Sequence, residues 1–291
     1  MPEISRILVP VVFSARCENA ARYAAALSCR FHGELTLLHV MVPTWAAYAT
    51  PEGYATPPRV ELENSKERTR CLLDQFLAEE LRGVQVRREL AEGDPAYTIT
   101  DCAASGRYDL IVLPTHGYGP FRRFLLGSVT AKVLHDTHCP VFTGPHLEHP
   151  PAVSSPEFRR VLCAIDLGPR SRPVVEWAWW FAQQFAGQLT VVYALPGAAV
   201  HLDGVYFDPQ WRNDMASQAR QRIDSLIAET GLRAEVRIEL GDVAPVVAGV
   251  AESVAADVVV IGRSQPHRRL GRLRTNAYAI IRESPCPVVA I

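Results

Sequence analysis

The sequence contains an internal repeat, and this feature constrains its fold more than any other. Residues 6–40 align with residues 160–194 without a gap, and Gly33 stands opposite Gly187. Each segment has the pattern of a strand, a loop, a helix, a turn and a second strand. The repeat continues in three further pairs of similar stretches: VQVRRELAEGDPA with AEVRIELGDVAP, YDLIVL with ADVVVI, and CPVF with CPVVAI. The unit is too long for a solenoid repeat, so the sequence predicts two copies of one domain.

Within each half, strand patterns alternate with helix patterns, which is typical of βαβ units and a parallel sheet covered by helices. The runs 35–40 and 109–113 are almost wholly apolar and predict central strands, whereas 234–240 alternates and predicts an edge strand. Gly33 and Gly187 stand where a helix C-cap glycine is expected. The first helix of each half has apolar residues at 4-3-4 spacing, which predicts one buried face: Ala20, Ala24, Leu27, Phe31 and Val174, Ala178, Phe181, Phe185.

Length and composition fit two domains with their own cores. The chain has 291 residues, of which 48% are hydrophobic and 21% are charged, as in globular proteins. The segment 144–158, GPHLEHPPAVSSPEF, is rich in proline and serine, as linkers are. We therefore place the first domain at 1–146, the second at 157–291, and the linker at 147–156.

Charge and cysteine usage restrict the partners and the compartment. The formal net charge is -1 and the pI is about 6.8, so no strong field attracts nucleic acid or an anionic membrane. No apolar run approaches the roughly 20 residues that a membrane span needs, and the start MPEISRILVPVVFS lacks a signal-peptide pattern. The seven cysteines form no CxxC pair. We expect a cytoplasmic protein with no nucleic-acid or membrane partner.

A glycine-rich stretch, residues 114–141, follows one of the apolar strands and is the candidate ligand site. Ligands of open parallel sheets bind beyond the carboxyl ends of the strands. Glycines there let the backbone approach a ligand, and Ser128 is the expected N-cap of a helix whose free N–H groups favour anions. Glycines also punctuate ordinary strand-to-helix loops, so the spacing alone leaves both interpretations open. The residues assigned to the site from this stretch are Pro114, His116, Gly117, Gly127, Ser128, Val129 and Thr130.

The same stretch resembles the nucleotide loop of the universal stress protein family, G-x2-G-x9-G-[ST]. Gly117, nine residues, and then Gly127-Ser128 fit that pattern, and EGDPAYTITDCAASGRYDLIVLPTHG and HCPVF also resemble the family. The resemblance covers both halves. It implies an α/β fold of two tandem five-stranded parallel-sheet, Rossmann-like domains, of the adenine nucleotide alpha hydrolase-like type. It also implies ATP or another adenine nucleotide with Mg²⁺, and pairing of the two domains through their last strands; we further expect a homodimer.

The two halves keep different parts of the family pattern. In the first half, Pro114 replaces the first loop glycine, and Val12 replaces the aspartate that contacts adenine in ATP-binding members. The resemblance implies that Val12 and the backbone of Val40 flank the base there. The second half keeps Asp166 and Gly262 but has bulkier residues in place of the later loop glycines, so it retains only a remnant of the site.

Other reactive side chains point to structural roles. His135, His138 and Cys139 resemble metal ligands, but no second ligand cluster accompanies them, so we expect no metal. Ser14 fits a loop or helix cap better than a nucleophile. Asp94 and Asp242 fit helix N-caps. For the tryptophans Trp177, Trp179 and Trp180, the sequence allows core filling or a packing surface against the other half or a second chain.

Three functions are compatible with these features. The first is a non-enzymatic stress-response or signalling module that binds adenine nucleotide in its first domain. The second is a ligand-free protein-interaction scaffold. The third is a weak ATPase, which would need a catalytic base near the γ-phosphate, and neither a P-loop nor an obvious base is present. We therefore assign no catalytic residue.

Overall fold

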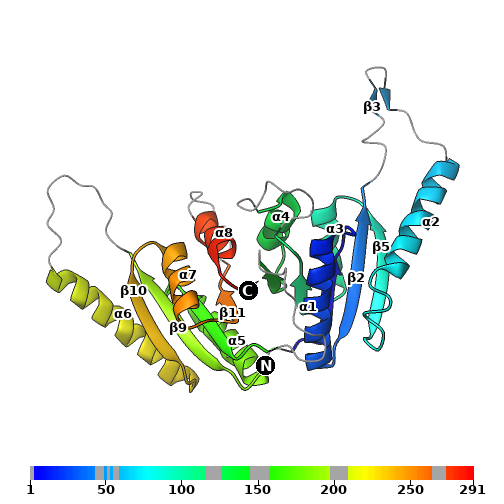
Figure 1. The fold of residues 1–291 in the computed structure, drawn as a ribbon. Coiled ribbons are helices and arrows are strands. Elements are labelled where there is room, and N and C mark those ends of the chain that lie inside the picture. Colours follow the sequence, from blue (N-terminus) through cyan, green and yellow to red (C-terminus); the bar gives the residue numbers. More distant parts are fainter. Residues whose placement is uncertain are drawn as a thin grey trace. The chain divides into compact units, whose positions relative to one another are not determined.

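The computed structural model describes residues 3–42, 49–50, 53–54, 59–115, 126–144, 157–196, 209–263 and 273–291. These form two compact units, one for each copy of the repeat (Figure 1). One unit contains the described residues from Glu3 to Phe142. The other contains those from Glu157 to Ile291, with Thr143 and Gly144.

The first copy has strands in the order β5-β2-β1-β6-β7, and each neighbouring pair in this order is parallel. The central strands predicted at 35–40 and 109–113 are confirmed as β2 and β6. A short antiparallel pair, β3 with β4, was not predicted. The elements are β1 (Arg6–Pro10), α1 (Ala15–Phe31), β2 (Glu34–Met41), β3 (Ala49–Thr50), β4 (Gly53–Tyr54), α2 (Arg59–Gln75), β5 (Val86–Glu92), α3 (Pro95–Ser105), β6 (Leu110–Val112), α4 (Ser128–Asp136) and β7 (Val141–Thr143).

The second copy repeats this topology with strand order β10-β9-β8-β11-β12, again in parallel. The edge strand predicted at 234–240 is β10, which stands at one end of the order. The elements are β8 (Arg160–Ile165), α5 (Ser171–Gln184), β9 (Gln188–Leu195), α6 (Pro209–Thr230), β10 (Glu235–Leu240), α7 (Val243–Ser253), β11 (Val258–Ile261), α8 (Leu273–Glu283) and β12 (Val288–Ala290).

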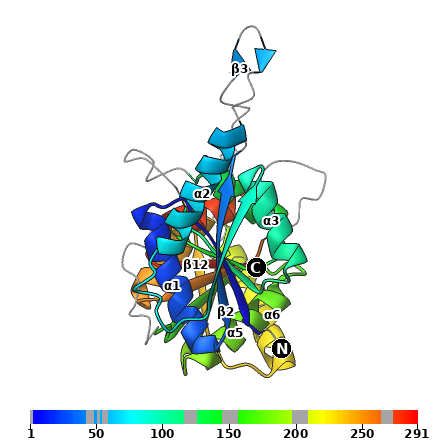
Figure 2. The ribbon, with the colours of Figure 1, turned by 90° about the vertical axis from the view of Figure 1, so that its right-hand side faces the viewer.

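The predicted apolar stripes face the sheets. In α1, Ala20, Ala24 and Leu27 are fully buried, and α1 and α3 cover opposite faces of the first sheet (Figure 2). In α5, the buried Trp177 stacks on Phe181 with ring centroids 5.2 Å apart, so it fills the core. The hypothesis that the other tryptophans form a packing surface stays a prediction.

The backbone geometry of the turn after α1 and α5 differs from the prediction. The left-handed residue is not glycine: it is His32 (φ 56°) in the first copy and Ala186 (φ 49°) in the second. Gly33 and Gly187 follow them and are required for close packing. A Cβ on Gly33 would lie 2.8 Å from the carbonyl oxygen of Ser5. The glycines therefore let the turn approach the chain that precedes the first strand of each copy.

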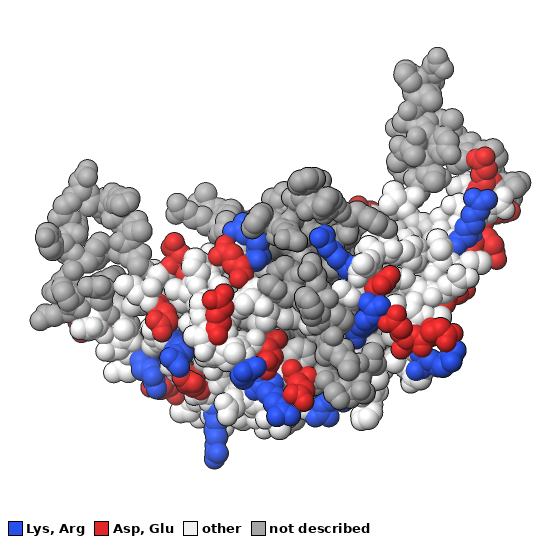
Figure 3. Space-filling view, in the orientation of Figure 1, with Lys and Arg blue, Asp and Glu red and all other residues white. Residues whose placement is uncertain are grey.

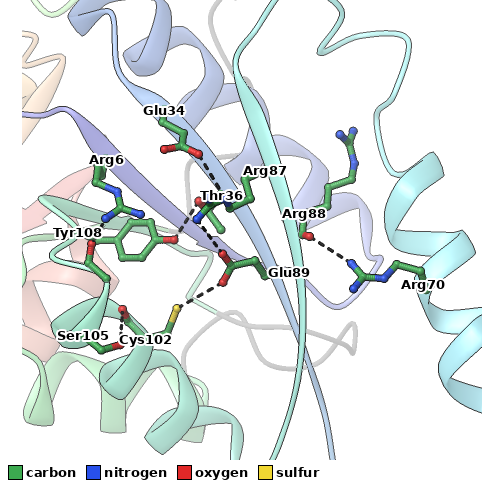
Figure 4. A network of polar contacts seen from close by, with 11 residues as sticks. Arg6, Glu34, Thr36, Arg70, Arg87, Arg88, Glu89, Cys102, Ser105 and Tyr108 are labelled. Atoms are coloured by element: carbon green, nitrogen blue, oxygen red, sulfur yellow. Dashed lines mark hydrogen bonds and ion pairs between the residues drawn. The ribbon is translucent and has the colours of Figure 1, made fainter.

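A polar network connects α3 to the first sheet at the amino ends of its strands (Figure 4). The Tyr108 hydroxyl donates to Thr36 Oγ1 at 2.9 Å, and the Arg6 guanidinium lies 4.8 Å from the centre of the Tyr108 ring. Cys102 Sγ lies 4.0 Å from Glu89 Oε2. Burial, and then the Glu89 carboxylate, raises the pKa of the Cys102 thiol, which disfavours the reactive thiolate.

Asp94 and Asp242 are confirmed as helix N-caps, but only the Asp94 side chain makes a capping hydrogen bond. Asp94 accepts a hydrogen bond from Tyr97 N at 2.8 Å and also contacts Lys132 Nζ of α4 at 3.2 Å. Asp242 occupies the N-cap of α7 without a side-chain hydrogen bond. The Tyr97 N–H first, and Lys132 second, lower the pKa of Asp94.

The close approach at Gly187 generates a stability prediction. Gly187→Ala places a methyl group 2.8 Å from the carbonyl oxygens of Phe158 and Arg159. We expect a loss of about 1–3 kcal/mol in the free energy of unfolding of the second domain. Urea denaturation followed by tryptophan fluorescence measures it, because Trp177 and its neighbours in α5 report on this domain.

Gly249→Ala is the matched control in the same domain. A Cβ at Gly249, within α7, meets nothing within 4 Å. We expect this variant to gain about 0.5–1 kcal/mol, because alanine restricts the unfolded chain and favours the helix. Equal effects of the two substitutions would contradict the close-approach argument.

The Asp94–Lys132 contact generates a pH prediction. Lys132→Met should raise the pKa of Asp94 but leave it below its ordinary value, because the Tyr97 N–H still donates. Since the pKa of Asp94 is depressed on folding, its stabilising effect is present above the unfolded pKa and is lost as pH falls through the folded pKa.

An NMR titration of the Asp94 carboxyl carbon in the full chain measures this shift. Lys66→Met is the control, because Lys66 pairs with Glu92 at 2.7 Å rather than with Asp94. An Asp94 pKa that is the same in the wild type and in the Lys132→Met protein would show that the ion pair does not form in solution.

Candidate functional site

The candidate site lies at the carboxyl edge of the first sheet, beyond the ends of β1 and β6. The chain leaves β1 toward β2 on one side and leaves β6 toward β7 on the other, so the strand order reverses between them. Open α/β sheets bind ligands at this kind of position. Val12 follows β1 and Pro114 follows β6, so two of the predicted site residues come from these neighbouring strands.

The segment after β6 is hydrogen-bonded to the start of α4. The Gly127 N–H donates to Thr115 O at 2.8 Å, and Thr130 Oγ1 donates to Pro114 O at 3.0 Å. Thr130 is buried. These two bonds hold the first turn of α4 beside the end of β6. His116 and Gly117 lie outside the described residues.

The predicted N-cap of α4 was wrong by one residue. Gly127 is the N-cap, with extended backbone at φ -61° and ψ 146°, and Ser128 is the first helical residue. No side chain caps this helix, so the amide groups at its start are not covered by a capping oxygen. Ser128, Val129 and Thr130 therefore supply the three N–H groups of the first turn, which helices leave without internal acceptors.

Aromatic rings that were not predicted to belong to the site hold the loop after β1. Phe13 has a left-handed backbone (φ 53°). Its ring stacks on His39 at 4.6 Å between centroids and contacts Phe76 edge-on at 5.9 Å. His39 Nδ1 lies 2.8 Å from Val11 O, and because a carbonyl only accepts, Nδ1 carries the proton. The sequence feature that could have indicated this contact is His39, a histidine within a mostly apolar strand.

The remaining predicted residues of the first copy take ordinary positions. Val12 is 39% exposed. Val40 is half-buried in β2 and pairs with Ala91 of β5. Ser14 is the N-cap of α1 and accepts from Cys17 N at 3.4 Å, as a capping serine does.

In the second copy, the aspartate that the first copy lacks stabilises its own loop. Asp166 Oδ1 accepts from Gly168 N at 2.8 Å and from Ser171 Oγ at 3.2 Å. Arg222 Nη2 donates to Leu167 O at 2.8 Å, on the residue whose backbone is left-handed. A Cβ on Gly262, the other remnant residue, would lie 3.0 Å from a methyl group of Val174 in α5.

Metal ligands and thiols do not gather into a site in the part of the chain that the structure describes. No group of three or more His, Cys, Asp or Glu side chains there could hold a metal ion. His135 Nδ1 contacts Asp136 Oδ1, and Cys139 Sγ lies 3.2 Å from Tyr108 O. Burial raises the pKa of Cys286 to about 11.

The surface shows no single-signed field on the face drawn in Figure 3, where acidic and basic side chains are interspersed. Among the described helices, none combines the length and apolar character that crossing a membrane requires.

Comparisons with known proteins place the chain in a family. Residues 3–143 and 157–291 each match the model of the universal stress protein family. Universal stress protein MJ0531 of Methanocaldococcus jannaschii is 30% identical over 137 residues, which cover 47% of this chain and 79% of the relative. The crystal structure of a universal stress protein from Archaeoglobus fulgidus shares the fold, with a TM-score of 0.69 at 22% identity over 99% of this chain and 96% of that chain.

A universal stress protein solved in complex with cAMP matches 47% of this chain and 98% of its own at 20% identity, with a TM-score of 0.34. The family model, in contrast, accounts for nearly the whole sequence in two successive matches. The resemblance noted in the sequence is confirmed: this chain belongs to the universal stress protein family, as a member with two tandem domains.

Proposed function

We propose that the first domain binds an adenine nucleotide, ATP among them, with Mg²⁺, and that the protein acts as a non-enzymatic stress-response or signalling module. The observation that carries the proposal is the start of α4. Its N-cap is a glycine without a side-chain cap, and it stands where the strand order reverses. Amide groups at a helix N-terminus favour phosphate through both hydrogen bonding and the helix dipole.

The positions around this helix start support the assignment. Thr130 Oγ1 and the Gly127 N–H are already bonded to the segment after β6, so they fix the helix rather than the ligand. The N–H groups of Ser128 and Val129 remain for phosphate oxygens. Mg²⁺ keeps several waters and is held largely by substrate phosphates, so a protein carboxylate cage is not required. The base would lie toward Val12 and Val40.

The hydrogen bonds of Asp166 favour a different role for the second domain. Its Asp166 is bonded within its own loop, which stabilises that loop without a ligand. We propose that this domain serves as a protein-interaction scaffold, that the two domains pair through their last strands β7 and β12, and that the protein is a cytoplasmic homodimer. Hydrolysis of ATP is the less favoured alternative, because the sequence contains neither a P-loop motif nor an obvious catalytic base in its first half.

Substitution of Ser128 tests the phosphate site. Ser128→Pro removes one amide donor at the first helical position, where proline is well tolerated, and the preceding Gly127 is already extended as proline requires. We expect the affinity for Mg-ATP to fall about tenfold to a hundredfold, as for loss of a hydrogen bond to a charged group. The thermal midpoint should not fall.

Isothermal titration calorimetry with the full chain measures these affinities, and Ser128→Ala is the matched control. Alanine keeps the amide and removes only the hydroxyl, so its affinity should stay within about threefold of wild type. Wild-type protein that gives no heat with Mg-ATP or ADP would overturn the proposed function. A Ser128→Pro protein that binds as tightly as wild type would place the phosphates elsewhere.

A further inference from the structure

We infer that two copies of the chain associate through the free edge of β10, which pairs with β10 of the second copy as an antiparallel neighbour. This inference rests on the homodimer of the proposed function and names its interface. β10 stands at one end of the strand order and β5 at the other. A strand at the edge of a sheet carries unpaired backbone N–H and C=O groups, to which a further strand can bind.

The backbone of β10 determines which residues can pair with a new strand. The Gly241 N–H, directly after β10, donates to Leu195 O of β9 at 3.0 Å. Backbone groups alternate in direction along a strand, so every second residue back from Gly241 also faces β9. The residues between them, Val236, Ile238 and Leu240, therefore direct their N–H and C=O groups to the free edge.

The self-pairing that these directions allow brings opposite charges together. With a two-fold axis at Ile238, this residue faces its own copy and Val236 faces Leu240, as hydrogen-bonded pairs. Arg237 then lies opposite Glu239 in non-hydrogen-bonded pairs, where the side chains are closer. An axis at Arg237 would instead place two arginines directly opposite each other, which is destabilising.

The side chains that this pairing uses are accessible. Leu240 is 49% exposed, and the side chains of Arg237 and Glu235 are 45% and 56% exposed. Arg237 Nε contacts Glu235 Oε1 at 2.6 Å, whereas Glu239 forms no ion pair with any residue that the structure describes. A second copy would cover Leu240 with Val236 and would give Glu239 a cationic partner.

The edge strand of the first copy has a similar pattern but is not suited to pairing with itself. Residues 86–90 read VRREL and residues 236–240 read VRIEL. The central residue of the first pattern is Arg88, so an antiparallel pair of β5 strands in the same register would set arginine opposite arginine. Arg88 also donates to Leu73 O at 3.0 Å and to Phe76 O at 3.1 Å, which commits its guanidinium to the end of α2.

Sedimentation velocity of the full chain tests the contact with charge reversals in β10. Arg237→Glu and Glu239→Arg each place like charges opposite each other at both symmetric positions. We expect either variant to raise the dimer dissociation constant by about tenfold. An equimolar mixture of the two variants should dimerise as the wild type does, because each negatively charged strand then faces a positively charged one. Recovery in the mixture also shows that both variants are folded.

Arg87→Glu is the matched control, since it makes the same reversal in the other edge strand. Arg87 pairs with Glu34 at 3.5 Å and with Glu89 at 3.4 Å within its own copy (Figure 4). We expect its dimer dissociation constant to equal that of the wild type. A dimer weakened by Arg87→Glu would place β5 in the contact and would overturn the inference.

The outcomes separate this inference from the proposed function. If neither β10 reversal weakens the wild-type dimer, or if the mixture stays monomeric, the β10 contact is wrong and the homodimer stands. If the wild-type chain is monomeric throughout the micromolar range, both the contact and the homodimer are wrong. Nucleotide binding is decided separately, by the calorimetry with Mg-ATP.

Discussion

Strand β1 is hydrogen-bonded on both sides, to β2 and to β6, and its central residues Ile7, Leu8 and Val9 are fully buried. A strand that is paired on both sides and covered on both faces cannot shift its register without exposing apolar surface. The position where β1 ends is therefore fixed, and so is the point where the strand order reverses. The start of α4 depends on this constraint, since the bonds from Gly127 and Thr130 attach it to the end of β6.

Much of this arrangement could be predicted from sequence because it follows from periodicity and repetition. The duplication, the central strands and the edge strand β10 depend on patterns that extend over many residues, and patterns of that length are reliable. The details that were mispredicted depend on single backbone angles. Whether Gly127 or Ser128 caps α4 differs by one residue, and both types are common at N-caps. His32 adopts a left-handed backbone although the next residue is glycine, because that glycine is needed for close packing.

Contacts between residues that are distant in sequence could not be predicted from the sequence either. Phe13 stacks on His39, and Lys132 of α4 reaches Asp94 at the start of α3. Neither pair is marked by local spacing, since each depends on the sheet bringing separate segments together. The function of a side chain in such a pair cannot be inferred from its own neighbours. The long-range pairs therefore had to come from the structure.

The two copies solve the same local problem with different chemistry. One residue in the loop after the first strand of each copy has left-handed backbone, Phe13 in one copy and Leu167 in the other. The strain of that turn must be balanced by local contacts. In the second copy Asp166 supplies them with its own carboxylate. In the first copy, the stacking of Phe13 on His39 supplies them. The loop of the first copy is thus held without the carboxylate that Asp166 supplies in the second. The first domain presents the exposed Val12 side chain at the position where the second holds a carboxylate that stabilises its loop. The duplication allows the two copies to differ at this position while both keep the same strand order.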